Sequence, residues 1–475
     1  MCGRTLCDAD RAAFPRRGLL LAFAAMLCVG SSSNAGAAPR QNFVVLLCDD
    51  LGYGDLSCFA NPAIRSPNLD RLASEGVKLT HCYSSSPVCS ASRAGLMTGR
   101  NHNRLGIRDW IPAASGIYLR PREVTVAQLL KQAGYRTCHV GKWHLNSRTN
   151  GSEPTPGDAG FDYWLYTQNN AAPSHLNPTN FIRNGQRAGL LKGPSSHVVV
   201  DEAIRWLDTV RGEPFFLNVW FHETHEPVAA ADEFLNLYAD ERNLDKRHYY
   251  GDVSQMDAAV GKLMKYLDDR GLRDSTLVFF SSDNGPETLK RYPAAERSYG
   301  SPGPLRGMKL HITEAGYRVP GILRWPGHAR PGTVSTEPVC NLDLLPTFCE
   351  IAGVRPPTDR ALDGASILPI FEGKPGTIRR MVVRPHPLYW QYDFAISRPW
   401  EVSLRDGPWK LLANKTLDRF ELYNLSDDIG EARNVAGGHP DLVRNMAAEM
   451  KRLHAEIQAE GARSGNPPPR QAKKK

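Results

Sequence analysis

Four short, largely apolar segments, each followed at once by polar residues, constrain the fold of this chain more than any other feature. Runs of this length that are rich in β-branched and aromatic residues are typical of central strands covered on both faces. Each of these strands would deliver polar groups at its carboxyl end. The segments and the polar residues after them are 43–47 with Asp49 and Asp50, 137–140 with Lys142 and His144, 215–220 with His222 and His225, and 277–280 with Asp283 and Asn284.

Helical patterns separate these segments, and the clearest of them covers residues 253–267. Its apolar residues are spaced three and four apart, so they share one face of a helix. Strands that alternate with helices predict an α/β fold with a large, mixed but mostly parallel sheet flanked by helices. In such sheets ligands bind beyond the carboxyl ends of the strands. We therefore expect the polar strand ends to meet at one site.

The sequence pattern changes near residue 380, where short β-like runs joined by turns replace the alternation. A helical pattern over residues 440–459 follows these runs. We predict a catalytic domain over residues 38–379 and a smaller C-terminal α+β subdomain with an antiparallel sheet over residues 380–462. The β-like runs are residues 381–384, 400–404, 408–412 and 420–423.

Both ends of the chain differ in composition from its body. Arg16-Arg17 precede an apolar run, and Ala35-Gly36-Ala37 offers a cleavage site, so residues 1–37 are predicted to be a cleaved export signal. The apolar run is shorter than the ~20 residues that span a bilayer, so no stable membrane insertion is expected. The protein would then be periplasmic or secreted. Residues 463–475 are predicted to form a basic, disordered tail.

The formal net charge of +8 comes almost entirely from these two ends. The signal carries +2 and the tail +5, which leaves +1 for the body of the chain. Clustered basic residues, rather than a basic total, mark nucleic-acid-binding proteins. We therefore predict no nucleic-acid partner, and the sequence gives no indication of an oligomeric state.

The cysteine count is odd once the signal is removed. Three of the ten cysteines lie within residues 1–37, which leaves seven in the exported chain. Even if the others paired, one thiol would remain free or be chemically altered.

Carboxylate and amide side chains follow two of the predicted strands. Gly52 and Gly54 would let the chain turn sharply after the first strand, so that both of its acidic residues face the mouth of the sheet. Three carboxylates in one pocket would repel one another unless a cation lay among them, and an all-oxygen set suits Ca²⁺ or Mg²⁺ better than zinc. Taken alone, each pair is more typical of an ordinary turn than of a metal site. The candidate ligands are Asp49, Asp50, Asp283 and Asn284.

The segment from Cys89 to Arg100, Cys-Ser-Ala-Ser-Arg-Ala-Gly-Leu-Met-Thr-Gly-Arg, is the most specific motif in the chain. It resembles the signature of the type I sulfatases, the formylglycine-dependent family of the alkaline phosphatase superfamily, with arylsulfatases and N-acetylgalactosamine-6-sulfatases as similar members. In that family a formylglycine-generating enzyme oxidises the cysteine to formylglycine, which would account for the odd thiol. Ala91 replaces the family's usual proline. The resemblance extends from Phe43 to about Ala459 and implies an alkaline-phosphatase-like fold.

The resemblance also implies a role for each polar strand end. The ligands of a divalent metal, usually calcium, would be the four candidates above together with the modified side chain of Cys89. The remaining implied roles are sulfate binding for Lys142 and Lys309, a position beside the nucleophile for Arg93 and His144, and contact with the leaving-group oxygen for His225.

These residues match the chemical needs of sulfate ester hydrolysis. A hydrated formylglycine derived from Cys89 would attack sulfur through one hydroxyl while His225 protonates the leaving oxygen. Loss of the proton of the second hydroxyl to His144 would then expel sulfate. We expect a sulfuric ester hydrolase that acts on a small sulfated molecule or a saccharide, with sulfated carbohydrates favoured.

Two alternatives follow from the same residues. The first is a phosphate or phosphonate monoester hydrolase on this scaffold, which Cys89 disfavours because phosphatase members use Ser or Thr at this position. The second is a non-catalytic carbohydrate-binding homologue, which would result if Cys89 stayed unmodified.

Overall fold

The structure is a computed structural model that describes residues 40–288, 291, 293–371 and 381–468. The predicted export signal at residues 1–37 and the part of the predicted tail from residue 469 onward lie outside these ranges.

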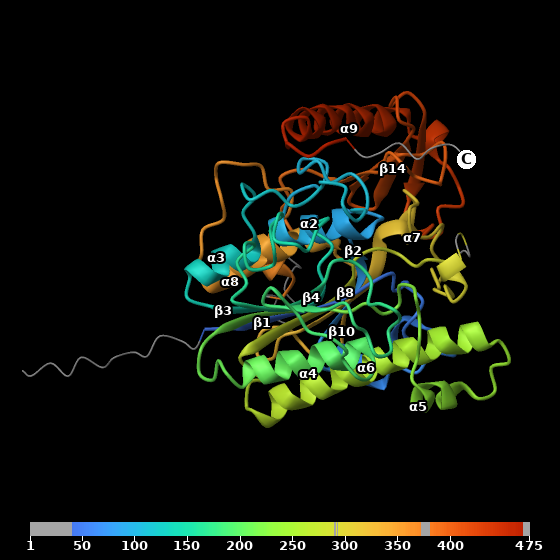
Figure 1. The fold of residues 1–475 in the computed structure, drawn as a ribbon. Coiled ribbons are helices and arrows are strands. Elements are labelled where there is room, and N and C mark those ends of the chain that lie inside the picture. The colour runs from blue at the N-terminus through green and yellow to red at the C-terminus, as the bar shows by residue number, and fades with distance from the viewer. Residues whose placement is uncertain (1–39, 289–290, 292, 372–380, 469–475) are drawn as a thin grey trace, which may run out of the picture. The chain divides into compact units, whose positions relative to one another are not determined.

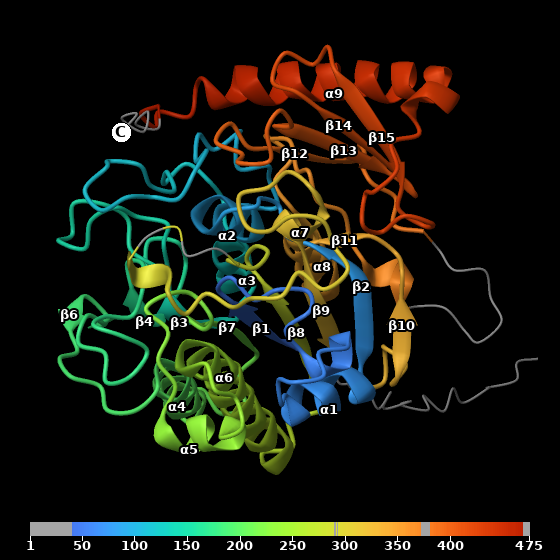
Figure 2. The ribbon, with the colours of Figure 1, turned by 90° about the vertical axis from the view of Figure 1, so that its right-hand side faces the viewer.

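Within the described ranges, eleven strands form one mixed sheet (Figures 1 and 2). Its central part has the order β8-β1-β7-β3-β4 and is parallel throughout. The four predicted strands are all in this central part. β9 runs antiparallel to both β8 and β2, and β5 and β6 are antiparallel at the far edge. The strands are β1 (Asn42–Cys48), β2 (Val77–Tyr83), β3 (Arg136–Lys142), β4 (Tyr163–Thr167), β5 (Ile182–Arg183), β6 (Gln186–Arg187), β7 (Phe215–Trp220), β8 (Thr276–Ser282), β9 (Arg318–Arg324), β10 (Thr333–Ser335) and β11 (Val339–Cys340).

Helices cover both faces of this sheet, as Figures 1 and 2 show. Side chains alternate along a strand, so β1 contributes Phe43, Val45 and Leu47 to one core and Val44 and Leu46 to the other. Both faces of the central strands are therefore buried, as their apolar sequences predict. One face carries α1 (Pro67–Glu75), α4 (Ser195–Leu207) and α6 (Leu244–Asp269), and the other carries α2 (Cys89–Thr98), α3 (Val126–Gln132) and α8 (Leu344–Ala352).

The remaining helices before residue 440 are short. Among the described residues, no helix is both long and apolar enough to cross a membrane. The α-helices are α5 (Asp232–Leu235) and α7 (Glu314–Tyr317), and 3₁₀ helices lie at Ser57–Phe59, Asn236–Tyr238, Pro293–Ala295, Asn341–Asp343, Leu368–Ile370 and Ala436–Gly438.

A separate four-stranded antiparallel sheet lies near the C-terminus. Its strands are paired in sequence order, and helix α9 (Pro440–Gly461) packs on one face through Met450 and Leu453. The predicted antiparallel sheet and its helix are both present. The domain boundary at residue 380 stays a prediction, because residues 372–380 lie outside the described ranges. The strands are β12 (Leu388–Gln391), β13 (Val402–Asp406), β14 (Trp409–Ala413) and β15 (Phe420–Asn424).

The first strand predicted for this sheet was placed too early in the chain. Residues 381–384 are irregular, and Met381 and Val383 are 68% and 87% exposed. Pro385 and Pro387 follow, and proline cannot donate a backbone hydrogen bond to a sheet ladder. The strand therefore begins after them, with β12.

The first six residues of the predicted tail, 463–468, are described and do not fit the prediction of disorder. Ser464 is buried, and the side-chain nitrogen Nδ2 of Asn466 donates to the backbone oxygens of Leu105 and Tyr118 at 2.9 and 3.1 Å. Residues 463–468 thus contact the segment between α2 and α3.

A buried ion cluster joins the small sheet to the start of α7. Lys410 Nζ lies 2.8 Å from both Glu314 Oε1 and Glu431 Oε1, and all three side chains are fully buried. Replacing Lys410 by Met is expected to cost about 3–5 kcal/mol in the free energy of unfolding, because it leaves two buried carboxylates without their shared cation. Urea denaturation measures this change. Lys415→Met at an exposed position is the control, with an expected change within about 0.5 kcal/mol; equal stability of both variants would contradict the prediction.

Candidate active site

The carboxyl ends of the central strands meet at one edge of the sheet, and the predicted site residues lie there. The parallel register of β8, β1, β7 and β3 brings their ends side by side. The amino end of α2 points at the same edge, with Cys89 as its first residue. The structure brings together Asp49, Asp50, Cys89, Arg93, Lys142, His144, His225, Asp283, Asn284 and Lys309, all buried except His225, which is partly buried.

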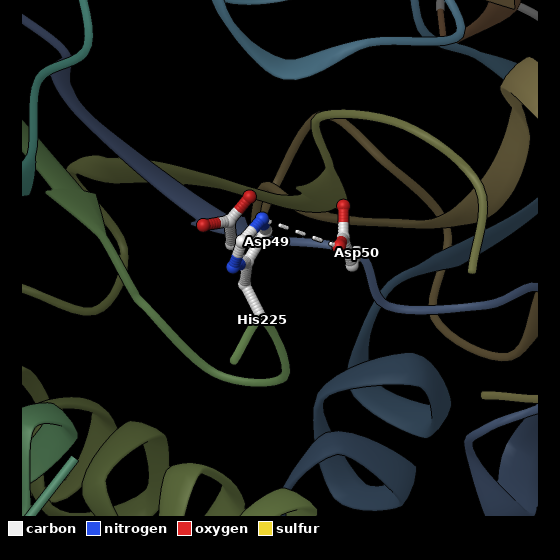
Figure 3. A group of neighbouring side chains, drawn as sticks. All are labelled: Asp49, Asp50 and His225. Carbon is white, nitrogen blue, oxygen red and sulfur yellow. Dashed lines mark ion pairs between the residues drawn. The ribbon is translucent and has the colours of Figure 1, made fainter. Parts of the chain in front are cut away.

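Oxygen ligands cluster at the ends of β1 and β8. Asn284 Nδ2 donates to Asp50 Oδ1 at 2.7 Å, and the backbone nitrogen of Asp50 donates to Asp283 Oδ1 at 3.3 Å. Asp49 and Asp50 lie side by side, with the ring of His225 next to Asp49 and an ion pair from it to Asp50 (Figure 3). The carboxylates and the amide predicted as metal ligands therefore share one pocket.

Three buried basic side chains neutralise the three buried carboxylates. Each base lies on a different carboxylate, and Arg93 also reaches towards Asp49 Oδ1 at 3.5 Å. Because these six charges balance, a divalent cation would give the group a net positive charge, which suits a sulfate anion. The pairs are Lys142 Nζ to Asp49 Oδ2 at 2.5 Å, Lys309 Nζ to Asp50 Oδ2 at 2.7 Å, and Arg93 Nη2 to Asp283 Oδ2 at 2.7 Å.

The pocket fits a divalent cation. Asp49 Oδ1 and Asn284 Oδ1 are buried and receive no hydrogen bond from any residue in the described part of the chain. Burial raises the pKa of Asp283 to about 7, although Arg93 acts in the opposite direction. A cation that takes oxygen ligands would satisfy the two acceptors and favour the ionised form of Asp283.

The backbone is strained at two of the strand ends. Asp50 and His144 have φ angles of 64° and 55°, in the left-handed region that non-glycine residues seldom adopt. The turn after β1 is therefore made at Asp50 itself and not, as the sequence suggested, at Gly52. A Cβ atom on Gly52 would lie 2.2 Å from the backbone oxygen of Ser301, so this glycine is needed for close packing.

Cys89 has a defined hydrogen-bond partner. Its sulfur lies 3.3 Å from Nδ1 of His144, and Nε2 of His144 lies 3.1 Å from the backbone oxygen of Ile111. Because a carbonyl oxygen only accepts, Nε2 carries the proton and Nδ1 presents its lone pair to position 89. Burial, reinforced by the charge of Lys142, holds the pKa of His144 well below its usual value, so the ring is neutral.

The thiol of Cys89 is poorly activated as it stands. Burial raises its pKa to about 11, despite the nearby charges of Lys142 and Lys309. Little thiolate is present at neutral pH, and the thiolate is the reactive form of cysteine.

His225 is oriented by two acidic neighbours. Its Nδ1 lies 3.0 Å from Glu226 Oε2, and its Nε2 lies 3.7 Å from Asp50 Oδ2, the ion pair drawn in Figure 3. Burial lowers the pKa of His225, but the charges of Asp50 and Asp49 contribute to a net rise. Sequence reasoning missed Glu226, because nothing in the pattern separates an orienting carboxylate from a surface one. His222 instead pairs with Thr167 Oγ1 at 2.7 Å.

Each of the seven cysteines in the described residues is unpaired. Cys58 is partly buried and the others are buried. The prediction from the odd count, that at least one thiol lacks a disulfide partner, agrees with this arrangement.

The chain is similar to known proteins in both sequence and structure. A family model described as Sulfatase matches residues 41–354, and a model described as N-sulphoglucosamine sulphohydrolase, C-terminal, matches residues 308–459. Arylsulfatase A of Homo sapiens is 34% identical over 489 residues, covering 92% of this chain and 90% of that protein. N-acetylgalactosamine-6-sulfatase of Rattus norvegicus is 36% identical over 366 residues, covering 70% of this chain and 66% of that protein.

The fold is also similar to that of solved structures. The crystal structure of Ps i-CgsB in complex with k-i-k-neocarrahexaose has a TM-score of 0.77 and 26% sequence identity. The match covers 90% of this chain and 94% of that chain.

Proposed function

The chain belongs to the sulfatase family of sulfuric ester hydrolases, and we propose that it removes sulfate from saccharides at the site around Cys89. The observation that carries the proposal is the meeting of Cys89, two lysines and an oxygen-lined pocket at the strand ends. The saccharide substrate is supported by the names of an N-acetylgalactosamine-6-sulfatase and of a neighbouring structure in complex with neocarrahexaose.

Two groups would complete the site. A divalent cation, calcium in our proposal with magnesium as the alternative, would be held by the four oxygen ligands and position 89, where it supplies positive charge for the sulfate oxygens. Formylglycine, made from Cys89 by a formylglycine-generating enzyme, supplies a hydrated aldehyde with one hydroxyl to attack sulfur and a second whose proton can leave.

The basic residues bind and orient the anion in this proposal. Lys142 and Lys309 each present an ammonium group that is held by its own carboxylate, Asp49 or Asp50. Arg93 lies one helical turn after Cys89 and fixes Asp283 with two nitrogens, at 2.9 and 2.7 Å. Charges held in place before the reaction stabilise charge that develops in the transition state.

The two histidines move protons in opposite directions. His144 is neutral with a lone pair facing position 89, so it can accept a proton from that residue. His225 pairs with Asp50 and Glu226, which favour its protonated form, so it can donate a proton to the leaving oxygen. Glu226 is a positioning residue for this donor.

The proposal also includes export of the protein to the periplasm or the medium. It is supported by residues 1–37, which have the pattern of a cleaved export signal. We also retain the catalytic domain at residues 38–379 and the C-terminal subdomain at residues 380–462 as proposals.

Parallel assays test the reaction class. With 4-nitrophenyl sulfate, 4-nitrophenyl phosphate, a sterol sulfate and a panel of sulfated monosaccharides, we expect kcat/KM for the best sulfate ester to exceed that for the phosphate ester at least about 100-fold, about 2.7 kcal/mol in transition-state binding. The reason for this expectation is Cys89, which stands where phosphatase members use Ser or Thr. A preference for the phosphate ester would contradict the proposal and favour the phosphate hydrolase alternative.

A further inference from the structure

Trp110 is an exposed aromatic residue at the edge of the catalytic site. Its side chain is 45% exposed, and its indole ring lies 6.4 Å from the imidazole of His144, tilted by 48°. His144 is buried and contacts the sulfur of Cys89. Trp110 is therefore the solvent-exposed member of a line of contacts that leads inward to position 89.

Asp109 lies beside this indole with one oxygen held and the other open. Its Oδ1 accepts hydrogen bonds from the Tyr392 hydroxyl and from the backbone nitrogen of Trp110, both at 2.8 Å. Oδ2 receives no hydrogen bond from the residues that the structure describes. Tyr392 is 2% exposed and directly follows β12, so the small sheet fixes the orientation of this carboxylate.

The Asp109–Tyr392 pair is close to the sulfate-binding side of the site. Burial raises the pKa of Asp109, and the charge of Lys309 acts against that rise. Burial likewise raises the pKa of Tyr392; the charge of Cys89 adds to this rise and the charge of Lys309 opposes it. The same segment contacts the site directly, because the backbone oxygen of Ile111, two residues after Asp109, lies 3.1 Å from His144 Nε2.

An exposed aliphatic residue contacts the segment that follows Lys309. Ile396 is 43% exposed, and its backbone nitrogen donates to the backbone oxygen of Leu310 at 3.1 Å. Leu310 directly follows Lys309. The segments that contact His144 and Leu310 thus offer an aromatic ring, an aliphatic side chain and one open carboxylate oxygen.

We propose that Trp110 and Asp109 form a subsite for the pyranose ring that carries the sulfate group. The proposal rests on the saccharide sulfatase activity proposed above and assigns the residues that select the sugar. The flat indole packs against the apolar face of a sugar ring, and the carboxylate accepts hydrogen bonds from its hydroxyl groups. Small-molecule sites typically combine apolar and aromatic side chains with a few polar groups.

Asp109→Asn separates sugar recognition from sulfate chemistry. Asparagine keeps an oxygen for Tyr392 and Trp110 but replaces the open oxygen by an amide NH₂ group. With the sulfated monosaccharide that the wild-type enzyme cleaves fastest, kcat/KM is expected to fall at least about 10-fold. With 4-nitrophenyl sulfate, which has no sugar hydroxyls, it is expected to stay within about 2-fold.

Trp110→Ala tests the ring face in the same way. The saccharide KM is expected to rise at least about 10-fold, and Trp110→Phe should restore most of the loss because it keeps an aromatic face. Leu190→Ala, which replaces another exposed apolar side chain, is the control and should leave kcat/KM unchanged for both substrates. Equal melting temperatures of all variants show that folding is unaffected.

Three results would overturn the subsite: equal losses on both substrates, an unchanged saccharide kcat/KM in both variants, or wild-type enzyme that cleaves 4-nitrophenyl sulfate but no sulfated monosaccharide. Failure of the proposed sulfate ester hydrolysis itself looks different, since the wild-type enzyme would then cleave no sulfate ester or would prefer the phosphate ester.

Discussion

Cys89→Ser enzyme is expected to fold normally and to lose at least about 1,000-fold in kcat for sulfate esters. A serine at position 89 carries one hydroxyl, so once it has taken the sulfate group it has no second hydroxyl through which to release it. The neutral, lone-pair-bearing Nδ1 of His144 would face an oxygen without a proton to give. Steady-state rates measure the loss.

Intact mass gives a second readout for this variant. Incubation with a sulfate ester should add one sulfate group to Cys89→Ser protein, as expected if the first half of the reaction proceeds and the second stops. Cys58→Ser is the matched control, because Cys58 is an unpaired thiol in another part of the molecule. Its kcat should equal that of the wild type. Near-wild-type turnover by Cys89→Ser protein would contradict the proposed chemistry.

Asp50→Asn is expected to lower kcat/KM at least about 100-fold and to abolish stabilisation by calcium. Asp50 holds Lys309 at 2.7 Å and accepts a hydrogen bond from Asn284 at 2.7 Å, so its charge serves both the cation pocket and the sulfate-binding lysine. Chelator-treated wild-type enzyme should lose activity and regain it with Ca²⁺. The variant should not recover.

Thermal unfolding separates metal binding from catalysis in this experiment. Calcium should raise the melting temperature of chelator-treated wild-type protein and leave that of Asp50→Asn unchanged, because only a protein that binds the ion is stabilised by it. Asp201→Asn is the control, since Asp201 pairs with Lys262 on the helical layer. A calcium-dependent shift in Asp50→Asn equal to that of the wild type would contradict the metal assignment.

The central fold follows from local sequence patterns. The apolar run at residues 43–47 and the helical spacing at residues 253–267 each report burial directly, and the structure has β1 and α6 at these places. The irregular stretch at residues 381–384 has a β-like composition as well. There the two following prolines decide the outcome, and composition alone gave the wrong prediction.

Part of the site was predictable because several of its residues directly follow apolar strands that the sequence reveals. Asp49, Lys142 and Asp283 follow predicted strands, and parallel strands bring their carboxyl ends to one edge. Lys309 lies in an irregular segment, so only its motif pointed to the site.

Residues placed by distant contacts could not be found from the sequence. Asp109 is oriented by Tyr392, which lies 283 positions later in the chain. Trp110 acquires its place beside His144 only through the tertiary fold. No periodicity connects such residues, and an isolated tryptophan in a loop reads equally well as part of the core.

The most direct test of the account is the chemical state of residue 89 in active, purified enzyme. Trypsin releases residues 79–93 as one peptide that contains both Cys82 and Cys89. After treatment with iodoacetamide, mass spectrometry should find one alkylated cysteine, Cys82, and an aldehyde in place of the CH₂SH group at position 89. Fully active enzyme in which both cysteines of this peptide are alkylated would contradict the account.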